Sequence, residues 1–333
     1  MADRISEVIR LYFQDENYEI KTVPFGLTNL TRIIELEGEK YVLRIYNPHT
    51  KNAESVSFEA GLTAFLSEQV LSFKVPLFIQ SRERGRPFVE LSDGTLGAMV
   101  SFIEGTVPEL STMQHAENFG SVLGELSSAL SKYQPEDHTY VGIPFTNLYD
   151  LHPLANRLTV RDFLKQPPFP ISPIMITNYN KAAEEVGKNI HVLASLPSQW
   201  VHHDVLIYNL LSRDGEIQGV LDYDFTSMDV GFMEFAISLI HIQQRTSGSW
   251  EMIENFVRGY SHWRNHSLDE LRQLQLLTQV YHLAVLHIYI GQHQAGQEIE
   301  QNFLYILNQL ISTNDWLDEH QTRLSQLLYA YLS

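Results

Sequence analysis

The chain has 333 residues, of which 44% are hydrophobic and 19% are charged, and this composition is ordinary for a globular protein with one large two-lobed unit or two domains. Its formal net charge of −17 makes it a poor candidate for binding nucleic acids or anionic membranes; the charge favours a cationic partner, and solubility alone would also account for it. The chain contains no cysteine, which excludes disulfide bonds and thiolate metal sites and agrees with a cytoplasmic location.

The first hundred residues predict a β-rich region. Residues 1–20 lack the apolar core of a signal peptide, and residues 4–14 have the spacing of a short amphipathic helix. Six runs predict antiparallel strands: Tyr18–Val23, Thr31–Leu36, Lys40–Tyr46, Leu77–Gln80, Phe88–Leu91 and Leu96–Phe102. Residues 53–70 predict a helix with one buried apolar stripe. We therefore expect an N-terminal lobe, a sheet plus a helix, over residues 1–103.

The pattern beyond residue 104 is mainly helical, and no apolar run reaches the length of a membrane span. Helical spacing of apolar residues predicts helices over about 119–130, 172–194, 250–263, 267–293, 297–312 and 315–331, with 131–170 as loop and short turns. Three histidines, His282, His287 and His293, do not have the spacing of metal ligands on one helix turn, so we expect them to be ordinary core or surface residues. A C-terminal lobe is expected over residues 104–333.

The polar side chains of residues 200–236 are the strongest functional signal in the chain. Asn209 follows Asp204 by five residues, and two apolar runs separated by Asp214-Gly215 then lead to Asp222. Asp-Gly between apolar runs predicts a β-hairpin, because glycine takes the positive φ that a tight turn needs. A hairpin brings its two ends together, so Asp204, Asn209 and Asp222 are expected to converge.

These residue types suit phosphoryl transfer. Asp and Asn side chains offer the oxygen ligands that Mg²⁺ prefers, and a further Asp nearby suits a hydroxyl group that must be oriented and deprotonated. One loop Asp for the acceptor, followed by an Asn and an Asp for the metal on ATP, is the layout of such a site. The alternative is a β-hairpin whose acidic ends are incidental.

The spelling His202-x-Asp204-x4-Asn209, followed by a strand that ends in Asp222-x-Asp224, resembles the aminoglycoside phosphotransferase family, to which homoserine-kinase-like and choline-kinase-like enzymes also belong. The family usually has glycine where this chain has His203. The resemblance implies an α+β, protein-kinase-like two-lobed fold, with a β-rich N-lobe and a mainly helical C-lobe. It also implies ATP and Mg²⁺ as cofactors.

The resemblance further implies a role for each matching residue. Asp204 would be the catalytic residue that orients the acceptor hydroxyl, Asn209 and Asp222 would hold the metal, and Asp224 would contact either the acceptor or a second metal. Nucleotide contacts would come from Val42, Arg44, Glu59, Ser101, Ile103 and a loop with Gly26, Thr28 and Asn29. Arg44 alone would also fit an exposed edge-strand charge, and Glu54 is the second candidate for the Glu59 position. Asp229 and Glu234 are expected to fix the loop by hydrogen bonding.

The acceptor is expected to be a small molecule with a hydroxyl group, because no room for an activation loop exists between Asp224 and the next predicted helix. Homoserine, aminoglycosides, amino alcohols and sugars all remain open, and an amine-bearing acceptor is favoured. Three alternatives stay open: a protein Ser/Thr kinase, an inactive nucleotide-binding protein, and a metal-dependent hydrolase built on His202, His203 and Asp204. Nothing in these patterns predicts an oligomeric state.

Overall fold

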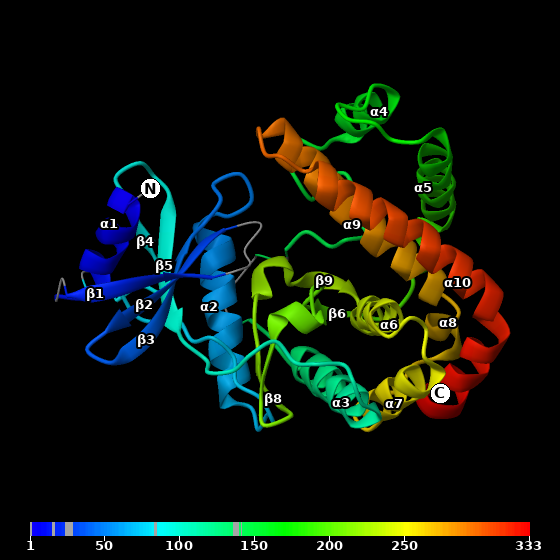
Figure 1. Cartoon of the computed structure of the whole chain (residues 1–333), viewed down its shortest axis with the longest axis horizontal. Coiled ribbons are helices and arrows are strands. Elements are labelled where there is room, and N and C mark those ends of the chain that lie inside the picture. Colours follow the sequence, from blue (N-terminus) through cyan, green and yellow to red (C-terminus); the bar gives the residue numbers. More distant parts are fainter. Residues whose placement is uncertain (1, 15–16, 24–28, 83–84, 136–139, 141) are drawn as a thin grey trace.

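The computed structural model describes the chain except for residues 1, 15–16, 24–28, 83–84, 136–139 and 141. An antiparallel sheet lies at one end of the molecule and a larger, mainly helical region at the other (Figure 1). Among the described residues, no helix is long and apolar enough to cross a membrane.

The N-terminal sheet has five strands in the order β1-β2-β3-β5-β4, and every neighbouring pair is antiparallel. The strands are β1 Tyr18–Thr22, β2 Leu30–Leu36, β3 Glu39–Ile45, β4 Val89–Glu90 and β5 Leu96–Ser101. Alternation along β3 sends Leu43 and Ile45 into a core with helix α1 (Ala2–Tyr12), as the period-two pattern predicts. The opposite face of β3 carries Arg44 toward helix α2 (Ala53–Glu68), which begins at a capping box formed by Asn52 and Ser55.

Helix α2 shares its apolar side chains with the helical region more than with the sheet. Its residues Phe58, Leu62 and Leu66 belong to the large core of the C-terminal region, where the rings of Phe58 and Trp200 lie 4.6 Å apart. A much smaller cluster, which includes Val56 and Ala98, joins α2 to the sheet. Figure 1 shows α2 between the sheet and the rest of the molecule.

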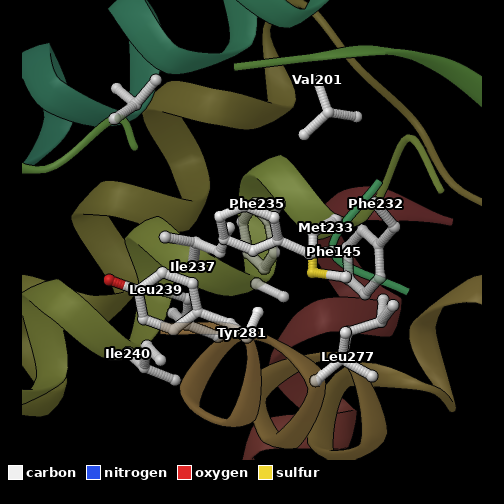
Figure 2. Packing of buried hydrophobic residues seen from close by; sticks show 14 of the residues in the cluster. Phe145, Val201, Phe232, Met233, Phe235, Ile237, Leu239, Ile240, Leu277 and Tyr281 are labelled. Carbon is white, nitrogen blue, oxygen red and sulfur yellow. The ribbon is translucent and has the colours of Figure 1, made fainter. Parts of the chain in front are cut away.

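The C-terminal region has eight described helices and two strand pairs. The helices are α3 Met113–Leu130, α4 Arg157–Lys165, α5 Pro173–Leu193, α6 Met233–Arg245, α7 Trp250–Ser261, α8 Leu268–Leu271, α9 Leu274–Gln294 and α10 Glu300–Leu332. Strand β6 (Ser198–Val201) pairs with β9 (Ser227–Val230), and β7 (Leu210–Arg213) pairs with β8 (Glu216–Val220) as the predicted hairpin. Helix α6 is buried along most of its length, and Figure 2 shows Phe232, Phe235, Leu277 and Tyr281 together in this core.

The structure corrects four expectations about the elements. Residues 77–80 are not a strand and form one isolated bridge, Phe78 to Val100. The pairing with β5 stops there because the amide of Ser81, which would continue it, donates to the carbonyl of Arg86 instead. The loop predicted over 131–170 contains α4, and the helix predicted over 267–293 is divided into α8 and α9.

The fourth correction is that the two helices predicted over 297–312 and 315–331 are one helix, α10. The sequence around Asn314 contains poor helix formers, but tertiary contacts hold it in place. The side chain of Gln279 donates to Asn314 at 3.2 Å, and that of Gln244 donates to Thr313 at 3.1 Å. These contacts outweigh the local propensity.

Helices α3 and α7 approach each other closely through two glycines. A Cβ atom added to Gly120 would lie 1.9 Å from the carbonyl oxygen of Phe256, and one added to Gly259 would lie 2.0 Å from the carbonyl oxygen of Glu117. Backbone atoms cannot move aside as a flexible side chain can, so both positions require glycine.

We predict that Gly120→Ala lowers the free energy of unfolding by about 3 kcal/mol, because the methyl group overpacks the α3–α7 contact. The matched control is Gly187→Ala in α5, where an added Cβ meets nothing within 4 Å. This control should stabilise the protein by about 0.5–1 kcal/mol through helix propensity. Urea unfolding of the three proteins measures both effects, and equal stabilities of the two variants would contradict the close approach.

Candidate active site

The open end of the β7–β8 hairpin brings the predicted polar residues together. The amide of Leu221 donates to the carbonyl of Asn209 at 2.8 Å, which closes the two ends of the hairpin. The side-chain amide of Asn209 donates to Asp204 twice, at 2.9 Å to its carbonyl and 2.7 Å to its carboxylate oxygen Oδ2. Asp222 is the next residue after Leu221, and its negative charge contributes to raising the pKa of Asp204. The convergence expected from the hairpin is therefore present.

Two residues of this site hold a left-handed backbone. His203 has φ 67° and Asp222 has φ 66°. This conformation costs a residue other than glycine about 1–2 kcal/mol, so the surrounding contacts must stabilise it. One such contact comes from α6, where the buried carboxylate of Glu234 accepts a 2.5 Å hydrogen bond from the amide of His202. Burial raises the pKa of Glu234 to about 7.

Arg44 reaches this site from the N-terminal sheet. Its guanidinium lies 2.5 Å from Glu59 of α2, 3.2 Å from Asp222 and 3.5 Å from Asp224. Arg44 is only 9% exposed, which excludes an exposed edge-strand charge. Glu59 is buried and Glu54 is exposed, so the sequence-predicted partner of Arg44 is the one that contacts it.

Lys51 is a functional candidate that the sequence did not predict. It lies just before α2, its side chain is 8% exposed, and its ammonium group donates to the carbonyl of Asp224 and lies 3.8 Å from that residue's Oδ1. Asn29 also donates to the Asp224 carboxylate. A lysine in a loop is usually solvated, and the contact joins residues 173 positions apart, so no local pattern signals it.

The two carboxylates of the Asp222–Asp224 loop have opposite pKa shifts. Burial raises the pKa of Asp222, and the charge of Asp224 raises it further. Burial would also raise the pKa of Asp224, but Lys51 and Arg44 together hold it below its usual value. Asp224 is thus already neutralised by protein cations, whereas Asp222 has charge left to be balanced.

Burial and neighbouring groups also have opposing effects on the pKa values of Arg44 and Asp204. Burial would lower the pKa of Arg44, but the surrounding carboxylates, Glu59 foremost, raise it well above its usual value. Burial raises the pKa of Asp204 well above its usual range, the charge of Asp222 adds to this, and the hydrogen bond from Asn209 opposes it. Asp204 is therefore a stronger proton acceptor than a free carboxylate.

The donor set at the hairpin end suits one Mg²⁺ ion. Asp222 offers an under-compensated carboxylate, and both hydrogen bonds of the Asn209 side chain use its nitrogen, which leaves its oxygen for a ligand. In the described part of the chain, no three His, Asp or Glu side chains form a self-contained metal cluster. This fits Mg²⁺, which is commonly held by one or two protein groups together with substrate phosphates.

The other expected nucleotide contacts are placed as follows. Gly26 and Thr28 lie outside the described residues, and Asn29 hydrogen-bonds to Asp224 and Asn47. Val42 lies on β3 opposite Val100 of β5.

The last residue of β5 has an amide that is already used. The amide of Ser101 donates to the carbonyl of Leu77 at 2.8 Å, so it is engaged within the protein. Ile103 is buried, and its side chain lies against Gly219 of β8.

Comparison with known proteins gives matches over most of the chain. A model of the family described as "Phosphotransferase enzyme family" matches residues 19–277. The chain is 23% identical over 300 residues to a homoserine kinase of Phenylobacterium zucineum, which covers 86% of this chain and 83% of that protein. It is also 23% identical over 268 residues to a homoserine kinase of Beijerinckia indica subsp. indica, covering 78% of this chain and 76% of that protein.

Solved structures of similar fold include two small-molecule kinases. An amicoumacin kinase, hAmiN, in complex with AMP-PNP, Ca²⁺ and Ami has a TM-score of 0.68 at 16% identity, covering 94% of this chain and 92% of that one. A microcompartment-associated aminopropanol kinase has a TM-score of 0.65 at 14% identity, covering 98% of this chain and 99% of that one. This likeness confirms the kinase-like α+β fold expected from the sequence.

We predict that Lys51→Met lowers the free energy of unfolding by about 2 kcal/mol or more, because it removes the charged donor to the carbonyl of Asp224 and one of the two cations beside its buried carboxylate. The matched control is Lys21→Met, which removes an exposed lysine paired with Glu35 on the sheet. The control should leave stability nearly unchanged, since exposed ion pairs contribute little. Equal losses in urea unfolding would show that the Lys51 contact does not stabilise the fold.

Proposed function

The chain belongs to the phosphotransferase enzyme family, and we propose that it is a kinase that transfers the γ-phosphate of Mg²⁺-bound ATP to a hydroxyl group of an amine-bearing small molecule. The observation that carries this proposal is the convergence of Asp204, Asn209 and Asp222 at one hairpin end, with Arg44 beside them. Similarity to a homoserine kinase over 86% of this chain supports a small-molecule acceptor.

In this proposal Asp204 is the catalytic residue. Asn209 holds its Oδ2, which fixes the carboxylate so that the other oxygen can accept a hydrogen bond from the acceptor hydroxyl. The raised pKa makes this carboxylate a suitable acceptor for the hydroxyl proton, which the acceptor loses as its oxygen bonds to phosphorus. Asn209 and Asp222 are the proposed metal-holding residues. Mg²⁺, when bound with ATP, neutralises charge on the phosphates.

The proposed nucleotide site lies between a lobe of residues 1–103 and a lobe of residues 104–333. Arg44, oriented by Glu59, neutralises phosphate charge, and Val42 and Ile103 border the adenine. Because the amide of Ser101 is engaged, backbone hydrogen bonds to the adenine edge are assigned to the neighbourhood of Ile103.

Asp224 is a different case, because its carboxylate is 2% exposed and is held by Arg44, Lys51 and Asn29. Contact with a second metal ion or with the acceptor would require these bonds to open. We therefore assign Asp224 to holding the N-terminal sheet against the hairpin.

The amine on the acceptor is supported by the charges around Asp204. The charged groups whose fields shift the pKa of Asp204 are the acids Asp222, Asp224 and Glu234. On α9, burial raises the pKa of Tyr289 to about 12, and the charge of Asp204 contributes. The net negative field at Asp204 and the nearby phenol of Tyr289 favour an ammonium group on the acceptor, which negative charge and aromatic faces both attract.

We predict that Asp204→Asn lowers kcat by about 10³-fold while the fold and ATP binding remain, because the amide cannot accept the proton. The control is Asp214→Asn at the exposed turn of the same hairpin, which should keep full activity. Thermal-shift titrations with ATP plus Mg²⁺, against ATP plus EDTA, verify nucleotide binding by each protein. Full activity of Asp204→Asn would disprove the catalytic assignment, and a silent titration of the wild-type protein would disprove the nucleotide site.

We predict that the enzyme prefers alcohols that carry an amine by at least about tenfold in kcat/KM, because the loss of one buried charge contact costs at least about 1.4 kcal/mol. Two matched pairs test this preference: 1-amino-2-propanol against 2-butanol, and homoserine against 4-hydroxybutyrate. Equal rates within both pairs would remove the amine from the proposal. Transfer to a protein hydroxyl, with all four alcohols silent, would favour a protein Ser/Thr kinase.

A further inference from the structure

Two adjacent histidines before Asp204 hold the two ends of the Asp222–Asp224 loop. The ring of His202 donates from Nε2 to the carbonyl of Leu221 at 3.0 Å, just before that loop. The ring of His203 donates from Nδ1 to the carbonyl of Phe225 at 3.1 Å, just after it. The loop that carries the proposed metal ligand is therefore tied at both ends to the residues that precede Asp204.

The two rings have different hydrogen-bond partners. Nδ1 of His202 accepts the amide of Asp204 at 3.2 Å, so this ring carries one proton and is neutral. Burial agrees with this, since it lowers the pKa of His202 to about 4. In contrast, both ring nitrogens of His203 face acceptors, because its Nε2 lies 3.1 Å from Oδ2 of Asp229.

Asp229 receives an amide donor at each of its carboxylate oxygens. Oδ1 accepts the amide of Val230 at 2.8 Å, and Oδ2 accepts the amide of Thr146 at 3.3 Å. With an acceptor facing each of its ring nitrogens, the His203 ring is placed to donate two hydrogen bonds. The ring is fully buried and stacked on Phe145 with centroids 4.3 Å apart.

We propose that His203 is a positioning residue that fixes the catalytic Asp204 relative to the Asp222–Asp224 loop through this doubly hydrogen-bonded, buried ring. The inference rests on the proposed kinase function. Phe225 and Asp229 lie on either side of the turn that leads into β9, so the ring ties that turn to the catalytic loop. A glycine at this position would have no side chain to make these bonds.

The backbone at His203 supports a role for the side chain. Its φ of 67° suits glycine and is unfavourable for histidine, so a histidine here strains the loop. A substitution to glycine would relieve this strain while removing both hydrogen bonds. Glycine therefore separates the two effects: backbone relief stabilises the loop, whereas the loss of positioning lowers turnover.

The test compares His203→Gly and His203→Asn with His282→Asn. Asparagine tolerates the left-handed backbone, and His282 is an equally buried histidine whose ring nitrogen Nδ1 bonds to the carbonyl of Thr278 within its own helix. With saturating ATP and the best of the four alcohols, we expect both His203 variants to lose roughly 10- to 100-fold in kcat, with KM for ATP changed less than about threefold. His282→Asn should keep kcat at temperatures well below its own melting point.

A loss of kcat in the folded His203 variants that exceeds the loss in His282→Asn supports positioning. Unchanged kcat in folded His203→Gly overturns it while leaving the kinase function in place. If the wild-type protein transfers phosphate to none of the acceptors, the proposed function fails, and the positioning role fails with it.

A second measurement does not depend on turnover. In protein labelled with ¹⁵N-histidine at neutral pH, His203 should show two protonated ring nitrogens and His202 should show one, with the His203→Gly spectrum giving the assignment. An unprotonated nitrogen on His203 would overturn the two hydrogen bonds donated by its ring, even in an active enzyme.

Discussion

The buried guanidinium of Arg44 is the constraint on which the arrangement of the N-terminal sheet, α2 and the hairpin loop depends. A cation removed from water needs nearby carboxylates, and removing one partner of such a pair leaves a charge that destabilises the fold strongly. Glu59 comes from α2, while Asp222 and Asp224 come from the hairpin loop, so one side chain requires three segments to meet. Lys51 adds a second cation at the same point. The junction between the N-terminal sheet and the hairpin is thus defined by charge balance as much as by apolar packing.

That balance also separates the roles of two neighbouring acids. Asp224 is compensated by groups from the N-terminal sheet and by Lys51, and its pKa is lowered as a result. Asp222 is partly compensated, half-buried and held in a strained backbone. Hydrogen bonds around the loop hold this backbone in place: the ring of His202 bonds to the carbonyl before the loop, and the ring of His203 bonds to the carbonyl after it.

The site could be predicted where it depends on local geometry. Asp204, Asn209 and Asp222 converge because an Asp-Gly hairpin brings the two ends of its strands together. The alternation of side chains along β3 placed Arg44 on the face that meets α2. The Arg44–Glu59 pair needed the family resemblance as well, since a glutamate on a helix is usually solvated. Lys51 and the His203–Asp229 pair could not be predicted, because each depends on contacts between side chains far apart in the sequence. The single helix α10 was missed for the same reason, as side chains of α6 and α9 hold its weakest turn.

The sharing of α2 between two cores has a mechanical consequence. Its large side chains Phe58 and Leu62 are embedded in the helical region, whereas only a small apolar cluster joins it to the sheet. If the molecule flexes, α2 therefore travels as a rigid body with the helices, and the plane of sliding lies between α2 and the sheet. The Arg44–Glu59 ion pair crosses that plane, so it sets the stiffness of the joint, and its burial shields this joint from changes in ionic strength.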